Sequence, residues 1–287
     1  MKKVLVLAAA MMAVVLSAKA EAEFAYDAGL EVVSSYIWRG QYNGGLSVQP
    51  DVEFGYDGEI SSLRIGAWGN VGASDWLFKK DKKDGTAFTQ LTKELDIVAS
   101  FSIVGLSVGF NHYYYCDGTS FFNWKSVADI DALGSTSTTE VWAGYSLEHF
   151  LGQNAYINWY TMVAGADLNY DENGDPKRAW SSYLEVGYDY TFDFGLTIGA
   201  QVGMSPWASE LYGNEKFAVT NVSLKANQEF ELGPVTLDIF AQGSINPDGL
   251  VADKKDPNYN LILPKAAGED KLYNQKLNGV IGLGVWF

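Results

Sequence analysis

Cysteine and histidine are almost absent from this sequence. One cysteine, Cys116, and two histidines occur among 287 residues. A single cysteine cannot form an internal disulfide, and so few sulfur and imidazole ligands argue against a transition-metal site. Glycine-rich phosphate-binding loops are also missing, because the glycines fall within patterned segments and turns. We therefore expect no cofactor.

Long hydrophobic runs are missing beyond the first twenty residues. A short basic start, the apolar run 4–16 and the small-x-small motif Ala18–Ala20 are typical of a secretory signal peptide. We assign residues 1–20 to the signal and 21–287 to a single domain. No later run approaches the roughly 20 residues of a membrane helix. A membrane location would therefore require strands.

Basic residues are scarce as well. The net charge is −15, and it becomes −18 once the three lysines of the signal are removed. Because phosphate binding needs a basic surface, this balance excludes nucleic acid as a partner.

Alternation of apolar and polar residues fills the mature chain. In the first segment, Phe24, Tyr26, Leu30 and their even-numbered neighbours are apolar, whereas most of the odd-numbered residues are small or polar. A period of two predicts strands with one apolar and one polar face. The same test predicts about twelve strands, at 24–38, 46–56, 63–71, 94–103, 106–115, 140–147, 155–163, 182–192, 196–205, 222–230, 235–245 and 277–287.

The connections between these strands alternate in length. Short turns on one side, long polar loops on the other and an even strand count are typical of an all-β, transmembrane, antiparallel up-and-down β-barrel. A soluble barrel would also alternate, with its apolar face turned inward. The signal peptide and loop asymmetry favour the bacterial outer membrane, where lipid and lipopolysaccharide would surround the wall. Phe287 ends the last strand and resembles the terminal signal read by the barrel-assembly machinery.

Three short motifs follow one another on the first, third and fourth predicted strands. They are "SSYIWRG" (34–40), "AWGN" (67–70) and "ELDI" (94–97). Together they resemble a family of functionally uncharacterised bacterial outer-membrane proteins, whose members carry S-x-Y-x-[FW]-R-G, W-G-x-N and E-[LIV]-D elements in this order. The resemblance covers about the first third of the mature chain. It implies an outer-membrane barrel and no established substrate.

If the apolar face of each strand contacts lipid, the opposite face lines the lumen, and that face carries many acids and few basic residues. Six lumen or constriction candidates converge near the long-loop end, namely Arg39, Asp51, Trp68, Asn70, Glu94 and Asp96. Arg39 is the cation of this group, and we expect it to pair with Asp51, Glu94 or Asp96, since an unpaired charge in a low-dielectric wall is costly. Tyr36 and Trp38, by parity, are expected at the membrane interface. A constriction that contacts a small polar solute is compatible with such a pair.

Metal and catalytic signals are weaker. Asp171, Asn173 and Asp175 have the oxygen spacing of a calcium loop, but no glutamate closes the pattern, which favours a solvated loop. His112 has no evident serine or aspartate partner from its spacing, so we do not expect an enzyme.

These patterns predict a narrow passive channel for small polar solutes, preferentially cationic or neutral, because acids lining a pore favour cations. A non-conducting barrel for structure, adhesion or surface binding is the alternative, and a membrane-embedded hydrolase is a remote third.

Overall fold

The computed structural model describes residues 23–72, 93–116, 120–122, 137–148, 154–171, 173–209, 211–247 and 277–287. The predicted signal peptide lies outside these residues. No helix in the described ranges is long and apolar enough to cross a membrane.

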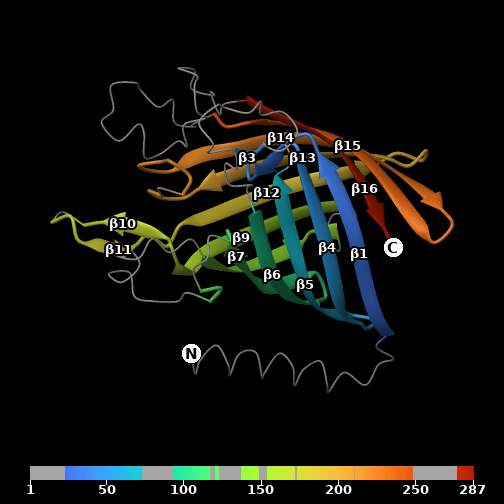
Figure 1. The fold of residues 1–287 in the computed structure, drawn as a ribbon, viewed down its shortest axis with the longest axis horizontal. Coiled ribbons are helices and arrows are strands. Elements are labelled where there is room, and N and C mark those ends of the chain that lie inside the picture. The colour runs from blue at the N-terminus through green and yellow to red at the C-terminus, as the bar shows by residue number, and fades with distance from the viewer. Residues whose placement is uncertain are drawn as a thin grey trace, which may run out of the picture.

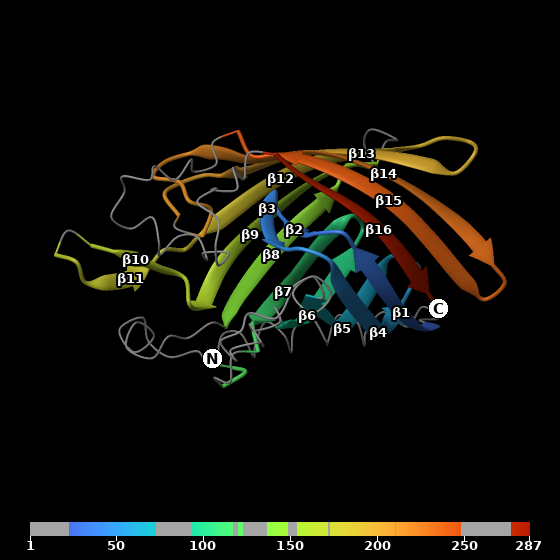
Figure 2. The same ribbon diagram turned by 45° about the horizontal axis from the view of Figure 1, so that its top comes forward.

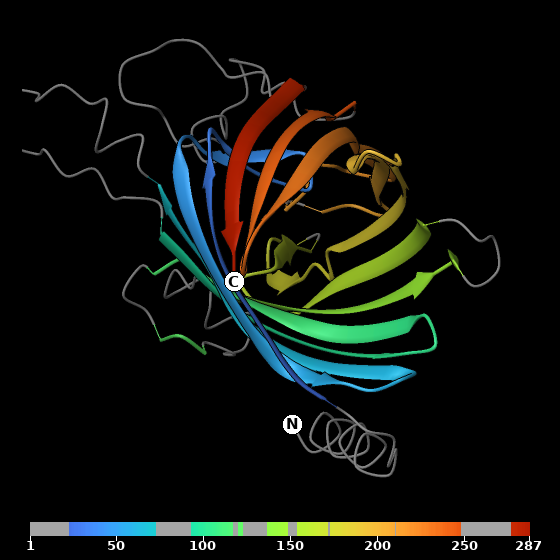
Figure 3. The ribbon, with the colours of Figure 1, turned by 90° about the vertical axis from the view of Figure 1, so that its right-hand side faces the viewer.

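Twelve strands close into one barrel in which every neighbouring pair is antiparallel (Figures 1 and 3). In chain order they are β1 (Glu23–Val33), β4 (Ser47–Asp57), β5 (Ser61–Gly72), β6 (Lys93–Ile103), β7 (Leu106–Tyr114), β8 (Thr138–Ser146), β9 (Asn154–Gly165), β12 (Ser182–Thr191), β13 (Leu196–Ser205), β14 (Ala218–Leu232), β15 (Val235–Ile245) and β16 (Leu277–Trp286). Pairing of β1 with β16 closes the ring. The predicted twelve-stranded antiparallel barrel is confirmed.

The two ends of the barrel differ. The short connections 58–60, 104–105, 192–195 and 233–234 lie at one end together with Glu23 and Phe287. We call this the turn end. The opposite, loop end carries the hairpin of β10 (Leu168–Tyr170) and β11 (Pro176–Arg178), which projects away from the ring (Figures 1 and 2).

The outer face of the wall is apolar and exposed. Phe24 is 60% exposed, Leu224 59% and Ile281 66%, and similar residues follow at every second position around the ring. A monomer in water rarely exposes so continuous an apolar surface. Since the apolar set faces outward, the soluble-barrel alternative does not fit this chain, and the outer face matches the lipid-facing band of a membrane barrel.

The first strand is shorter than its sequence pattern predicts. β1 ends at Val33, and the chain then turns into the lumen as a hairpin of β2 (Tyr36–Trp38) and β3 (Gln41–Gly44), which pair only with each other (Figure 3). We call residues 36–44 the lumen hairpin. The prediction that Tyr36 and Trp38 lie at the membrane interface is wrong, because the turn carries both side chains into the barrel, where Tyr36 is 8% exposed.

Two serines allow the chain to leave the wall. The Ile281 amide donates to Ser34 Oγ at 2.9 Å, and Ser35 Oγ donates to the Gly279 carbonyl at 2.5 Å. These side-chain bonds satisfy part of the β16 edge that a longer β1 would have paired, so the departure leaves fewer backbone groups without a partner.

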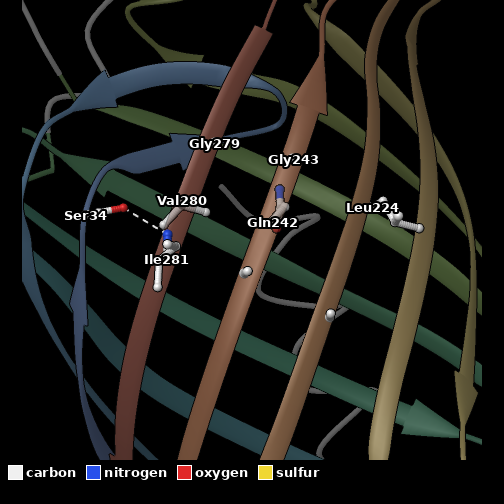
Figure 4. Close-up of a pocket in the computed structure, with 9 residues that line it drawn as sticks. Ser34, Leu224, Gln242, Gly243, Gly279, Val280 and Ile281 are labelled. Carbon is white, nitrogen blue, oxygen red and sulfur yellow. Dashed lines mark hydrogen bonds between the residues drawn. The ribbon is translucent and has the colours of Figure 1, made fainter.

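Small residues leave a shallow depression in the outer wall, next to the place where the chain leaves β16 at the end of β1. Ala226, Ala241, Gly243 and Gly279 line a shallow cavity of about 480 Å³ with Ser34 at its edge (Figure 4). Its described lining carries no charged side chain, so it offers a polar solute no ionic contact.

Replacing Leu283 by arginine tests the lipid-facing assignment of the outer wall. Leu283 lies on the outward face of β16 and is 44% exposed. In lipid vesicles, we expect Leu283→Arg to lower the free energy of unfolding by about 2–4 kcal/mol, because a charge near the bilayer midplane is poorly solvated. Leu283→Ala is the control for lost packing. An arginine variant no less stable than the alanine variant would contradict the assignment.

Candidate lumen site

The turn of the lumen hairpin is held against the inner wall. Arg39 and Gly40 both adopt left-handed backbone conformations, with φ of 49° and 80°. A Cβ atom at Gly40 would lie 2.9 Å from the Thr220 carbonyl and the Asn221 side chain, so only glycine fits here. The Asn278 side chain donates to the Gly40 carbonyl at 2.7 Å. The turn therefore packs against β14 and β16.

Arg39 extends from this turn to the far wall. β8, β9 and β12 lie opposite β1 in the order of the ring. The two terminal nitrogens of Arg39 donate to the two carboxylate oxygens of Glu140 on β8, at 2.6 and 2.8 Å. The side chains are 8% and 1% exposed, so this two-point ion pair is buried. Such geometry is the strongest form of an arginine–carboxylate interaction.

Aromatic rings enclose the same guanidinium group. Its central carbon lies 4.0 Å from the ring centre of Tyr160, 4.6 Å from that of Trp38 and 4.7 Å from that of Tyr183. The Tyr212 hydroxyl accepts a further bond from Arg39 at 2.7 Å. We call Glu140, Trp38, Tyr160, Tyr183 and Tyr212 the Arg39 cage. Ring faces at these distances attract a cation, more strongly where water is excluded.

The carboxylate of the cage is fixed from its own wall. Tyr113 donates its hydroxyl to Glu140 at 2.9 Å, and Asn111 donates its amide at 3.1 Å; both lie on β7. Glu140 is thus oriented independently of the hairpin. The tyrosine rings also support one another, since Tyr183 and Tyr212 stack with 5.5 Å between their centres.

The partner predicted for Arg39 is wrong. Asp51, Glu94 and Asp96 were expected, but the ion pair joins Arg39 to Glu140. Glu94 instead accepts hydrogen bonds from the hydroxyl groups of Tyr36 and Tyr115. The inward turn of the hairpin is the physical cause, because it carries Arg39 away from the wall of β4, β5 and β6.

Several of the other candidates do meet around Tyr36. The Tyr36 ring lies 5.4 Å from the Trp68 ring, and the Tyr36 hydroxyl is hydrogen-bonded to Glu94. Residues from all three sequence motifs therefore meet at Tyr36. Asn70 accepts a bond from Gln49 at 3.1 Å and is 1% exposed. Asp51 lies directly opposite Trp68 on the neighbouring strand and is only partly buried.

A cavity of about 470 Å³ lies inside the barrel beside the hairpin. Its lining includes Trp38, Trp68, Asp96, Asn111, Lys225 and Gln242. Asp96 is 6% exposed, and among the described residues its Oδ1 atom has no hydrogen-bond partner. A buried carboxylate oxygen facing a polar cavity favours a cation or a hydrogen-bond donor there. The lumen thus contains the cage, which Arg39 occupies, and the cavity beside the hairpin, which we call the acidic chamber.

The weaker candidates have local roles. Asp171 Oδ1 accepts the backbone amides of Asn173 and Asp175 at 2.8 and 3.0 Å, which caps the β10–β11 turn and lowers the pKa of Asp171. Within the described ranges, no group of three His, Cys, Asp or Glu residues could hold a metal ion.

His112 faces outward, as its parity predicts, but it is buried beneath a loop. Its ring nitrogens lie 2.8 Å from Thr139 Oγ1 and 2.7 Å from the Phe121 carbonyl, and the rings of Phe121 and Phe122 cover it. These contacts give His112 a packing role.

Sequence reasoning missed most of the cage. By its alternation Glu140 is one of the many acids expected in the lumen, with nothing in the sequence to distinguish it. Tyr160 and Tyr183 sit on predicted strands, but Tyr212 lies in a long connection. Inward parity combined with ring order, which places β8, β9 and β12 opposite β1, would have pointed to Glu140, Tyr160 and Tyr183.

Comparisons with solved structures find outer-membrane channels of low sequence identity. No family model matches the chain, and no curated protein does. Among solved structures, an outer-membrane channel from Pseudomonas putida F1 has a TM-score of 0.46 at 12% identity, covering 91% of this chain and 94% of that one. OmpF of Salmonella typhi in complex with daunomycin gives 0.33 at 10%, covering 93% and 97%, and the P. putida toluene transporter TodX gives 0.34 at 10%, covering 92% and 89%. We transfer no residue role or solute from them.

Replacing Gly203 by alanine tests how the cage is packed. A Cβ atom at Gly203 on β13 would lie 1.9 Å from the Tyr183 hydroxyl. We expect Gly203→Ala to displace Tyr183 and to lower the free energy of unfolding by about 1–3 kcal/mol, a typical cost of overpacking. Gly243→Ala on β15 is the matched control, because nothing lies within 4 Å of its Cβ position. Equal effects of the two substitutions on thermal unfolding would contradict this packing.

Proposed function

We propose that this protein is an outer-membrane channel for small polar, cationic or neutral solutes, and that its own lumen hairpin closes it in the conformation described. The observation that carries the proposal is the buried Arg39–Glu140 pair, which fastens the hairpin across the lumen from β1 to the opposite wall. The solute, the outer-membrane location and contact with lipopolysaccharide and the assembly machinery belong to this proposal.

The architecture supports a pore with a movable closure. The wall closes without the hairpin, because β2 and β3 belong to a separate two-stranded sheet. Segments with few wall hydrogen bonds open locally at a lower free-energy cost than the sheet that surrounds them. Displacing residues 36–44 would therefore widen the lumen and leave the barrel intact.

The charges of the lumen support a preference for cations. Of the three basic side chains described on the inward face, Arg39 is paired with Glu140, and Arg64 is paired with Glu53 and Asp57. Lys225 lies over the Phe240 ring. Within the described part of the chain, Glu94, Asp96, Asp189 and Asp238 form no ion pair, and an acidic lining favours cations over anions.

We call the Arg39–Glu140 ion pair the latch, and its removal tests whether the hairpin closes the lumen. We expect Arg39→Ala to raise single-channel conductance in planar bilayers well above that of the wild type, since breaking a buried ion pair costs about 3–5 kcal/mol and destabilises the closed hairpin. Arg64→Ala is the matched control, because it removes a lumen arginine at the turn end that does not touch the hairpin. Heat-resistant migration in gels establishes that each barrel is folded.

A folded Arg39→Ala barrel that conducts no better than the Arg64→Ala barrel would refute the latch. If deletion of residues 36–44 also left the barrel silent, the channel proposal would fail, and the non-conducting alternative would stand.

The acidic chamber generates a separate expectation for selectivity. In the Arg39→Ala background at alkaline pH, where both groups are ionised, we expect Glu94→Gln combined with Asp96→Asn to lower the permeability ratio of K⁺ to Cl⁻, because the lumen loses two negative charges. Reversal potentials in a salt gradient measure this ratio. Asp175→Asn at the exposed β10–β11 turn is the control, and an unchanged or increased ratio in the double variant would contradict the acidic-lumen argument.

A further inference from the structure

The Arg39 guanidinium is surrounded as a bound ligand would be. Three aromatic ring centres lie 4.0, 4.6 and 4.7 Å from its central carbon. The Glu140 carboxylate accepts two hydrogen bonds from it, and the Tyr212 hydroxyl accepts a third. Aromatic faces combined with a carboxylate are the chemistry with which proteins recognise free organic cations. Here the chain supplies the cation itself.

Most of this cage stays in place if the hairpin moves. Tyr160 and Tyr183 belong to β9 and β12, Glu140 to β8, and Tyr212 to the connection before β14; only Trp38 travels with Arg39. Glu140 would still be held in orientation by its bonds from Tyr113 and Asn111. Without Arg39 the carboxylate of Glu140 would lack the cation that now compensates it, so an external cation would be drawn to this position.

We propose that the cage is a binding site for small solutes that carry a guanidinium group, and that such solutes compete with Arg39 for it. The inference rests on the proposed channel function, because the hairpin that Arg39 anchors is the proposed closure. Binding of the solute and release of the hairpin are then linked, so the solute favours the open pore.

The shape of the cage favours guanidinium over ammonium. Glu140 presents both oxygens to one edge of a planar group, which a guanidinium fills with two parallel N–H bonds. The Tyr160 ring lies 4.0 Å from the central carbon, which suits a flat cation that stacks on a ring. A quaternary ammonium ion fits the rings but offers no donors to Glu140.

The hairpin is suited to release. Its turn depends on the left-handed backbone of Arg39, and side-chain bonds attach it to the rest of the chain, such as Gln41 Nε2 to the Leu211 carbonyl at 3.0 Å. Gly40 precedes β3, Gly44 is its last residue and Gly45 follows it. These glycines allow the segment to rotate as a unit when its latch is replaced.

The test measures binding directly, in detergent, on the full mature chain. Isothermal titration of methylguanidinium chloride into Arg39→Ala should show affinity at least about tenfold above that of the wild type, in which Arg39 occupies the cage. Arg39→Ala combined with Glu140→Gln should lose the binding. Arg64→Ala, which vacates a different carboxylate pair, should behave as wild type, and tetramethylammonium chloride should bind Arg39→Ala more weakly than methylguanidinium.

Equal affinity in the wild type and Arg39→Ala, or binding that survives Glu140→Gln, would overturn the site. Should Arg39→Ala fail to fold, the wild-type latch provides a second measurement. A maleimide probe reacts with Gln41→Cys in a Cys116→Ser background, and methylguanidinium should accelerate its attachment several-fold over sodium chloride at equal ionic strength. No acceleration would refute the competition.

Binding and conduction separate the two proposals. If Arg39→Ala binds methylguanidinium but no latch variant conducts, the site stands and the channel proposal fails. If Arg39→Ala conducts but does not bind methylguanidinium, the channel stands and the guanidinium site fails.

Discussion

The buried ion pair between Arg39 and Glu140 is the interaction on which the arrangement of the lumen depends. It joins residues 101 positions apart in the chain, from a hairpin that starts beside β1 to a strand on the far side of the ring. Burying two charges costs several kcal/mol in lost hydration, and mutual attraction offsets that cost only with good geometry and further hydrogen bonds. The bond that Arg39 donates to Tyr212 and the bonds that Glu140 accepts from Tyr113 and Asn111 supply that geometry. We therefore assign the pair a role in positioning the hairpin rather than in stabilising the barrel.

The inner wall is built to hold large rings. Inward glycines repeatedly lie where neighbouring aromatic side chains need space, as with Gly203 beside Tyr183, Gly187 beside Tyr156 and Gly282 beside Phe240. A twelve-stranded barrel is narrow, so bulky lumen residues require small residues next to them. Glycine weakens strands intrinsically, but a closed ladder of hydrogen bonds compensates for this loss. The cage is thus a consequence of wall composition as well as of Arg39.

Local alternation was enough to predict the wall. All twelve strands appear near their expected positions, because a period of two survives wherever one face meets an apolar medium and the other a polar lumen. The same rule failed at Tyr36 and Trp38. Their spacing continues that of β1, and parity cannot distinguish a side chain that faces lipid from one that has been carried inside by a turn. The only local cue was the pair Ser34–Ser35, which is a weak turn signal by itself.

The partner of Arg39 could not be predicted for a different reason. Ring closure, rather than any local pattern, brings β8 to face the hairpin, and the inward acids along the chain are equivalent by spacing. Their contacts distinguish them: Glu140 receives two polar bonds from β7, whereas Asp51 remains partly open and Asp96, although 6% exposed, has an oxygen without a partner among the described residues. A carboxylate prepared in this way requires a cation whether or not the hairpin supplies it. This requirement does not depend on the conformation of residues 36–44. The same site can therefore hold Arg39 as a latch or bind a competing solute.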